Sequence, residues 1–511
     1  MPRTFCVTGK QQIMTATASA SSTPQPLSTD GPQILGQPRG LATLFFTEMW
    51  ERFTYYGMRA LLVLFMTAAV VKGGLGLDDR TANAIYGMYI SGTYLLCLLG
   101  GWIADRLIGQ QKAVFFGGIL IMLGNASLAI GDPRLFFVGL VVIVLGVGLL
   151  KPNISAVVAQ LYPEGGSRRD AGFSIFYMGI NLGAFLGSLF VPIVAKKFGW
   201  NIGFALPAIG MLLGLIQFHY TRKYLGQAGI APPGKRATWW PVIIFMAILA
   251  VVGALVFSGR IGFDPVAVSR GANWAMVALA AGYFAYMLGF AGLDRTERNR
   301  VWVMIALFVG CAMFWAGYEQ AGASFNLFAE RHTERLVFGW DMPAGVLQAV
   351  NPLFIIIFAP VFAAIWVNLG RRNMDLSSPA KFGVGLIFMG LGFLVMFAAA
   401  GYVVQGQKVL PTWLILTYLL HTFGELCLSP VGLSSMTKLA PARFVGQVMG
   451  VWFLATAIGN NLAGQFAGEI DPSNLPGMPG QFLYLFWWGG IAGAVMLILT
   501  PYIKRLMSGV K

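Results

Sequence analysis

Fourteen apolar stretches, separated by short polar links, follow one another along almost the whole chain. A helix needs about 20 mostly apolar residues to cross the hydrocarbon core of a bilayer. Only 11% of the 511 residues are charged, whereas soluble domains carry about 25%. The sequence therefore predicts an all-α membrane protein with 14 transmembrane helices. These helices are expected near 41–70, 82–104, 113–130, 135–161, 171–195, 201–219, 239–259, 272–292, 301–324, 344–369, 380–401, 411–435, 444–469 and 481–503.

The stretches divide into six, two and six. The polar link "TRKYLGQAGIAPPGKR" follows the sixth stretch, and the next two stretches stand apart from the last six. We expect two six-helix bundles with an inserted helix pair, and this apolar pair is expected to face lipid rather than substrate. The predicted parts are a disordered cytoplasmic tail (1–40), an N-terminal bundle (41–219), a linker with the extra pair (220–300), a C-terminal bundle (301–505) and a cytoplasmic tail (506–511).

The positive charges predict the orientation in the membrane. Most of the 35 Lys and Arg residues fall in the links on the side of the N-terminus, and cytoplasmic loops carry such an excess. We therefore expect a multi-pass protein of the cell inner membrane with both termini in the cytoplasm. This accounts for the +15 net charge without nucleic acid. The stretch "FAERHTER" (328–335) is expected to be a solvated loop on the opposite side.

Seven ionisable side chains lie inside the apolar stretches. Each would cost about 2.5–3.5 kcal/mol at the centre of a bilayer if it stood alone. They must therefore face the protein interior or a water-filled cavity, and most of them must pair. These residues are Glu48, Glu51, Arg52, Arg59, Lys151, Glu319 and Glu425.

Four of these charges form a polar stripe on the first helix together with Tyr55. On a helical projection the stripe covers an arc of roughly 100° and a length of about 16 Å at 1.5 Å per residue, which predicts that it lines a cavity. Across all seven charges, four acids face three bases, so one carboxylate has no cation and could hold a transported proton. His421 is the only histidine that lies well inside a predicted membrane helix rather than at its end, and it is the rival proton site.

Nothing in the sequence resembles a catalytic or metal site. The four cysteines, at positions 6, 97, 311 and 427, have no metal-binding spacing, and those in apolar stretches are expected to be buried. No nucleophile stands beside a base. We therefore expect neither an enzyme nor a metalloprotein.

Seven motifs together resemble the proton-dependent oligopeptide transporters, the peptide branch of the major facilitator superfamily. "ExxERFxYYG" (48–57) resembles the family signature of the first helix, and the other six follow in the family's order over about residues 41–505. They are "GGWIADRLIG" (100–109), "GLLKPNIS" (148–155), "FSIFYMGINLG" (173–183), "FWAGYEQAGAS" (314–324), "NPLFIIIFAPVF" (351–362) and "GELCLSP" (424–430). In two places the chain departs from the family: Gly87 stands where animal members carry a histidine, and Ala184 where the helix 5 signature has a serine.

The resemblance implies a fold and an activity. The fold would be the major facilitator fold, with two six-helix bundles plus the extra pair. The activity would be symport of di- and tripeptides driven by protons, without a cofactor, in a lipid bilayer and as a monomer.

The resemblance also implies roles for individual residues. Glu48, Glu51, Arg52 and Glu319 would couple protons; Arg52 and Lys151 would attract the peptide carboxylate, and Glu425 the amino terminus. Arg59–Glu319 would close the periplasmic side, and Lys151–Glu425 the cytoplasmic side. Asn181 and Asn351 would hydrogen-bond the peptide backbone, and Tyr56, Tyr94, Trp315, Ser429 and Trp452 would line the pocket, which Arg59 borders. Asp105 and Arg106 of the loop motif would form a breakable contact between helices.

Charges on both halves suit short peptides, because a dipeptide extends only about 7 Å and a tripeptide about 10 Å. Three alternatives stay open. A transporter of nitrate or another small anion would give Glu425 nothing to bind, and a drug or sugar facilitator would not need charges for peptide termini. A nutrient sensor without transport would normally carry a signalling domain.

Overall fold

The computed structural model describes residues 33–34, 36–163, 166–231, 238–372, 374, 376–470 and 475–507. Within these ranges the chain is almost entirely helical, and 14 helices have 18 or more residues. Eleven helical segments are long and apolar enough to cross a membrane. The helix containing Glu48, Glu51, Arg52 and Arg59 is not among them, since its charges lower its hydropathy. The prediction of an all-α membrane protein is confirmed.

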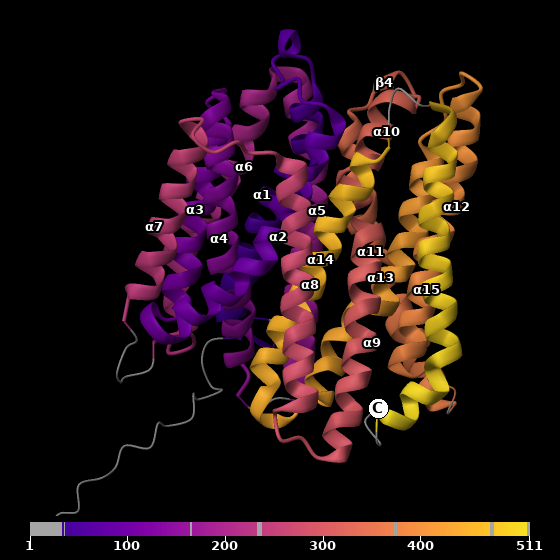
Figure 1. Ribbon diagram of the computed structural model, residues 1–511. Coiled ribbons are helices and arrows are strands. Elements are labelled where there is room, and N and C mark those ends of the chain that lie inside the picture. Colours follow the sequence, from indigo (N-terminus) through magenta and orange to yellow (C-terminus); the bar gives the residue numbers. More distant parts are fainter. Residues whose placement is uncertain are drawn as a thin grey trace, which may run out of the picture.

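The first six helices form the N-terminal bundle (Figure 1). They are α1 (Arg39–Thr67), α2 (Asp79–Ile103), α3 (Gln110–Leu128), α4 (Pro133–Gln160), α5 (Gly166–Phe198) and α6 (Trp200–Thr221). A short hairpin of β1 (Gln33–Ile34) and β2 (Gln37–Pro38) precedes α1. Residues 33–34 and 36–38 of the predicted disordered tail therefore have a defined structure, while 1–32 and 35 lie outside the described residues.

The last helices form the C-terminal bundle. They are α9 (Arg295–Tyr318), α11 (Val350–Arg371), α12 (Ser378–Val404), α13 (Thr412–Leu439), α14 (Val445–Gly468) and α15 (Met478–Leu506). Between α9 and α11 lie the short helix α10 (Ser324–His332), the hairpin of β3 (Leu336–Val337) and β4 (Trp340–Asp341), and the 3₁₀ turn η5 (Ala344–Ala349). Six helices in each half are the arrangement expected of the major facilitator fold. In Figure 1, α10 and β4 mark the upper end, and the C-terminus lies at the lower end.

The extra pair consists of α7 (Trp240–Phe257) and α8 (Pro265–Gly289). No residue of α7 is buried, as expected for a lipid-facing helix. Helix α8 is also exposed over more than half of its residues, but it packs in addition against both α2 and α14 and buries Met276, Phe284 and Met287. The Ser269 hydroxyl on α8 also donates a hydrogen bond to Asn461 on α14 (2.9 Å). Thus α8 bridges the two bundles at the front of the view in Figure 1.

Glycines let helices approach closely at two places that position the site. On α5, side chains at Gly183 or Gly187 would overlap backbone carbonyl oxygens of α1, so α1 lies directly against α5. Between the bundles, a side chain at Gly464 on α14 would overlap the carbonyl oxygen of Asn83 on α2. Small residues of this kind allow such close helix pairs in membranes. Gly87, noted above as a departure from the family that the sequence resembles, lies at this same contact of α2 with α14.

Candidate functional site

The seven charges predicted inside the membrane are all held within the protein. Six are buried, with exposed fractions of 9% or less, and Lys151 is half-buried. They come from four helical segments of both bundles: α1, α4, η4 (Glu319–Gly322) directly after α9, and α13. The helix α5 packs against α1 and fixes its position. Three cysteines in the described residues were expected to be buried, and all three are buried and form no disulfide there. They are Cys97, Cys311 and Cys427.

On α1, one guanidinium serves two carboxylates. Arg52 Nε lies 3.0 Å from Glu48 Oε1, one turn back, and also forms an ion pair with Glu51. The Arg52 guanidinium carbon lies 5.3 Å from the centre of the Tyr55 ring, within the range of a cation–π contact. The part of the predicted polar stripe from Glu48 to Tyr55 is therefore connected within α1, and up to Arg52 it carries one more negative than positive charge.

At the upper part of the stripe, Arg59 joins the two bundles. Its Nη2 lies 3.1 Å from Glu319 Oε2, and both side chains are about 95% buried, with exposed fractions of 4% and 5%. Arg59 Nε also donates a hydrogen bond to the Tyr86 hydroxyl (2.9 Å), and that hydroxyl donates to Glu319 (3.3 Å). The pair is thus part of a triad that includes a residue of α2 which the sequence did not single out.

The chain changes direction at Glu319, and this places the carboxylate toward α1. The helix α9 ends at Tyr318, and residues Glu319–Gly322 form a 3₁₀ turn before α10. A side chain at Gly322 would overlap the Tyr86 hydroxyl and approach Arg59 Nε to 2.7 Å. The triad therefore depends on glycine at this turn.

Glu425 on α13 has neutral partners. It accepts a hydrogen bond from the Tyr318 hydroxyl (2.6 Å) and lies 3.4 Å from Asn351 Nδ2. Asn351 also binds Thr422 Oγ1 (2.9 Å) and the Tyr318 hydroxyl (2.8 Å). No ion pair joins Glu425 to a cation among the described residues, including Lys151.

Lys151 on α4 likewise has no carboxylate within 4.0 Å in the described part of the chain. Its Nζ lies 3.5 Å above the centre of the Tyr94 ring on α2. Pro152, which follows it, lies inside α4. The expected Lys151–Glu425 pair is therefore not formed in this structure, in which the upper pair Arg59–Glu319 is formed.

The other predicted pocket residues differ in their surroundings. Tyr56 stacks under Arg59, 5.4 Å from ring centre to guanidinium carbon, and Trp315 packs edge-on against Tyr318 (5.1 Å). Asn181 is buried and donates to the Tyr177 carbonyl oxygen (2.9 Å), and Ser429 is half-buried on α13. Trp452 is buried against Phe382, with ring centres 6.3 Å apart. Asp105 and Arg106 are exposed in a π-helical turn, η2 (Ala104–Ile108), where Asp105 accepts from Gln110 (3.2 Å).

Two further ion pairs connect the bundles at the upper end. Arg331 on α10 forms two hydrogen bonds with Asp79 on α2 (2.5 and 2.7 Å). The prediction of a solvated loop at 328–335 is therefore wrong, because most of it is the second half of α10, anchored by buried Phe328. Lys196 on α5 binds Asp341 in β4 (2.5 Å), and its hydrogen bond holds the pKa of that exposed carboxyl below the ordinary value.

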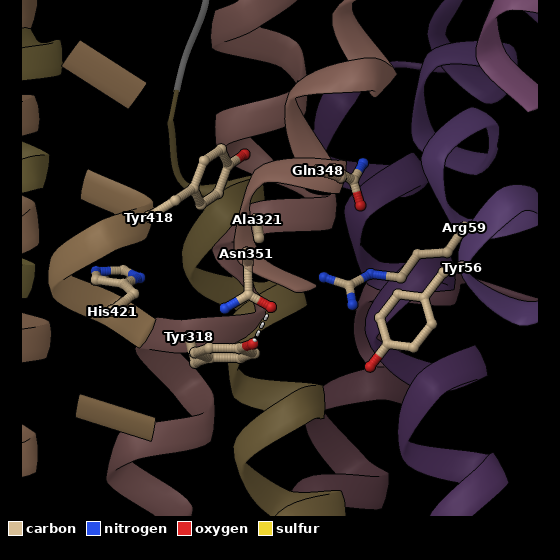
Figure 2. Close-up of a pocket in the computed structure, with 8 residues that line it drawn as sticks. All are labelled: Tyr56, Arg59, Tyr318, Ala321, Gln348, Asn351, Tyr418 and His421. Atoms are coloured by element: carbon tan, nitrogen blue, oxygen red, sulfur yellow. Dashed lines mark hydrogen bonds between the residues drawn. The ribbon is translucent and has the colours of Figure 1, made fainter. Parts of the chain in front are cut away.

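A pocket lies between the bundles beside Arg59 and Asn351 (Figure 2). Tyr56 and Arg59 border it from α1, while η5, α11 and α13 contribute the opposite walls. Sequence reasoning missed five of its residues or gave them no substrate role, although Tyr318 and His421 stand one and four positions before predicted site residues. The lining is Tyr56, Arg59, Tyr318, Ala321, Gln348, Asn351, Tyr418 and His421.

Comparison with known proteins gives consistent matches. Residues 111–479 match the PTR2 model of the POT family. The chain is 42% identical to Peptide transporter YePEPT of Yersinia enterocolitica over 94% of this chain and 97% of that protein. It is 36% identical to the Di-/tripeptide transporter of Lactococcus lactis, with 93% and 98% covered. A crystal structure of the peptide transporter POT in complex with alafosfalin superposes with a TM-score of 0.85 at 44% identity, over 94% of this chain and 97% of that one.

These matches extend over both bundles and the extra helix pair. They fit the predicted motifs and the buried charges that the structure holds between the halves. The protein is a transporter rather than an enzyme, and the chain belongs to the POT family of peptide transporters.

Proposed function

We propose that this transporter is a proton-coupled symporter that imports di- and tripeptides by alternating access. The observation that carries the proposal is the state of Lys151 and Glu425. They have opposite charges, they come from opposite bundles, and neither has an ion-pair partner among the described residues. Buried unpaired charges are costly, so a ligand with a charge at each end is the natural partner for this arrangement.

A short peptide has such charges at its termini. Its carboxylate would bind Lys151, assisted by Arg52, and its ammonium group would bind Glu425. Asn351 bonds Glu425 and would be near the first peptide group, and Asn181 would serve the backbone from α5. Because a tripeptide extends about 10 Å, termini recognition limits the length while the aromatic residues Tyr56, Tyr94, Trp315 and Trp452, with Ser429, tolerate varied side chains.

The upper ion pairs support alternating access. Arg59–Glu319, Asp79–Arg331 and Lys196–Asp341 all join the two bundles at that end, so the upper end is closed here. In the opposite state these pairs would separate, and Lys151 and Glu425 would pair at the lower side once no peptide holds them apart. Rocking of two bundles about a central site is the general scheme for this fold.

The proton would act on the Arg59–Glu319 pair. Protonation of Glu319 removes the charge that holds Arg59, which weakens the contact between the bundles and favours opening of the upper end. On α1, one Arg52 neutralises only one of Glu48 and Glu51, so a second proton can be held there. Each proton that moves down a potential of 100 mV releases about 2.3 kcal/mol.

The charges at the lower end support an orientation with that end in the cytoplasm. Cytoplasmic loops of membrane proteins are enriched in Lys and Arg, and the lower loops are rich in them. Examples are Arg168, Arg169, Arg222, Lys223, Arg371 and Arg372. Both termini would then be cytoplasmic in the inner membrane, with Asp105 and Arg106 in a cytoplasmic loop. A monomer, with protons as the driving ion and no cofactor, completes the proposal.

Uptake of labelled Ala-Ala into proteoliposomes with an imposed inward proton gradient tests this function. Wild type should concentrate the peptide, and Glu319→Gln should retain exchange but lose gradient-driven accumulation. The exposed Glu469→Gln is the matched control, since the same chemical change far from Arg59 should leave accumulation intact. If wild type moved no short peptide but did move nitrate under the same gradient, the anion alternative would replace symport of peptides.

A further inference from the structure

The imidazole of His421 is held rigidly in the wall of the pocket. Its exposed fraction is 1%, and the rings of Phe393 and Phe325 lie 5.1 and 5.7 Å from it. On α12, a side chain at Gly392 would overlap the imidazole ring, so the space that the ring occupies depends on that glycine. The ring position is therefore built into the packing of α12 and α13.

One contact defines the tautomer of this ring. His421 Nε2 lies 3.1 Å from the carbonyl oxygen of Met389. A carbonyl oxygen can only accept, so Nε2 must carry the hydrogen and donate it. In the neutral imidazole Nδ1 is then an acceptor, and it is buried without a hydrogen-bond partner among the residues that the structure describes. Buried polar atoms nearly always have a partner, so this acceptor points to a missing donor in the pocket.

A second unpartnered polar group borders the same pocket. Gln348 in η5 is 5% exposed, and within the described part of the chain its Nε2 is buried without a hydrogen-bond partner. Its carboxamide offers both a donor and an acceptor. In the view of Figure 2, His421 and Gln348 lie on opposite sides of Asn351. The pocket therefore presents hydrogen-bonding groups on two walls, both unsatisfied.

This pocket directly adjoins the group proposed to bind the peptide ammonium. Tyr318 and Asn351 line the pocket, and both bond the Glu425 carboxylate. The side chain of a peptide's first residue branches from the carbon atom that carries the ammonium group. Binding of the ammonium group at Glu425 would therefore place that side chain next to the neighbouring pocket.

We propose that the pocket is a specificity subsite for an uncharged polar side chain on the first residue of the peptide. His421 Nδ1 accepts a hydrogen bond from the hydroxyl or amide of that side chain, and Gln348 bonds its remaining polar atom where the side chain has one. A cationic side chain is disfavoured because Arg59 borders the pocket, and a carboxylate is disfavoured by the acceptor Nδ1. The inference rests on the proposed peptide symport and adds the side-chain preference.

The test compares peptides of nearly equal shape in the proteoliposome assay. In wild type, kcat/KM for Thr-Ala should exceed that for Val-Ala by about 3- to 10-fold, the effect of one net hydrogen bond, and Asn-Ala should exceed Leu-Ala similarly. The reversed peptides Ala-Thr and Ala-Val should give a ratio near 1. In His421→Leu the Thr-Ala to Val-Ala ratio should fall to about 1. Because each ratio is taken within one variant, a general loss of rate cancels.

Two results would overturn the inference while leaving symport intact. One is a ratio of kcat/KM for Thr-Ala to Val-Ala near 1 in a wild type that transports Ala-Ala. The other is a ratio for Ala-Thr to Ala-Val that is as large as the ratio for Thr-Ala to Val-Ala. Gln348→Met is the second variant, for use where His421→Leu does not fold, and it should lower the Asn-Ala to Leu-Ala ratio. An unchanged ratio there refutes the subsite as well. Failure of wild type to transport any dipeptide would instead refute the proposed function.

Discussion

The Asp79–Arg331 ion pair predicts a measurable coupling between the two bundles. Asp79 lies in the first turn of α2, and Arg331 lies near the end of α10. Asp79→Asn and Arg331→Gln each remove the charge with little change in shape. We expect both single variants to shift the equilibrium toward the state with an open upper end. The double variant should shift it by less than the sum of the two, because the pair is lost only once.

The magnitude follows from the geometry. Two short hydrogen bonds connect the charged groups, and hydrogen bonds to charged groups contribute about 1.5–3 kcal/mol when well shielded. The Asp79 side chain is 11% exposed and the Arg331 side chain 32%, and exposed ion pairs contribute only about 0.2–1 kcal/mol. A coupling free energy of about 1–2 kcal/mol lies between these limits, which is about a 5- to 30-fold change in the ratio of the two states.

Distances between spin labels measure this ratio. Labels at Arg134→Cys, at the upper start of α4, and Gln405→Cys, at the upper end of α12, report on opposite bundles from exposed positions. In Asp79→Asn, a larger fraction of molecules should show the longer distance between the labels than in the parent protein. A double-mutant cycle then gives the coupling and cancels the effect of Asp79 on the helix dipole of α2.

The exposed pair Lys196–Asp341 serves as the matched control. Its side chains are 38% and 66% exposed, so Asp341→Asn should change the ratio by less than about 2-fold, as expected for a solvated pair. If Asp79→Asn left the distance distribution unchanged, or if Asp341→Asn had as large an effect, then burial of an ion pair would not determine how strongly it holds the bundles together. The reasoning would be refuted.

Three further predictions concern packing, the upper triad and the peptide carboxylate. Gly100→Ala should destabilise the protein by about 1–3 kcal/mol, because its methyl group would overlap a backbone carbonyl oxygen of α4. A side chain at the neighbouring Gly101 meets nothing within 4 Å among the described residues. Thermal unfolding in detergent should therefore occur at a lower temperature in Gly100→Ala than in Gly101→Ala. Gly322→Ala should shift the equilibrium toward the state with an open upper end, and it should lower thermal stability less than Gly100→Ala does. The same spin-label distances would show the shift, and an unchanged distance distribution would contradict the role of this turn. Lys151→Gln should raise KM for Ala-Ala at least about 10-fold, as expected when a bond between charged groups is lost, while Tyr94→Phe should leave KM within about 2-fold because the ring face is retained.

The amino-acid sequence by itself determined the number and order of the long helices and the place of every membrane charge. Charged side chains are so costly in hydrocarbon that their occurrence in apolar stretches predicted a polar interior. The same logic predicted that Glu48, Glu51, Arg52 and Arg59 form one stripe, because a helix repeats every 3.6 residues. These results depend on local periodicity and on the transfer free energies of side chains, both of which follow directly from the residue types and their spacing in the sequence.

Only the tertiary structure decided which charges meet. Charge counting left one carboxylate without a cation but could not say which, because the answer depends on contacts between residues hundreds of positions apart. The structure assigns two carboxylates to Arg52 and leaves Glu425 to Tyr318 and Asn351. This also leaves Lys151 without a carboxylate partner among the described residues, an outcome that pairing by count does not produce.

The remaining differences have the same origin. Hydropathy alone did not indicate that α8 bridges the bundles, since an apolar helix in lipid and one against protein have similar compositions. It also hid α10, because a nine-residue helix rich in charge reads as a loop until Arg331 meets Asp79 across the bundle interface. Hydropathy and periodicity determine what each helix is, whereas packing between distant segments determines which side chains face one another. The proposed site depends on that second kind of information.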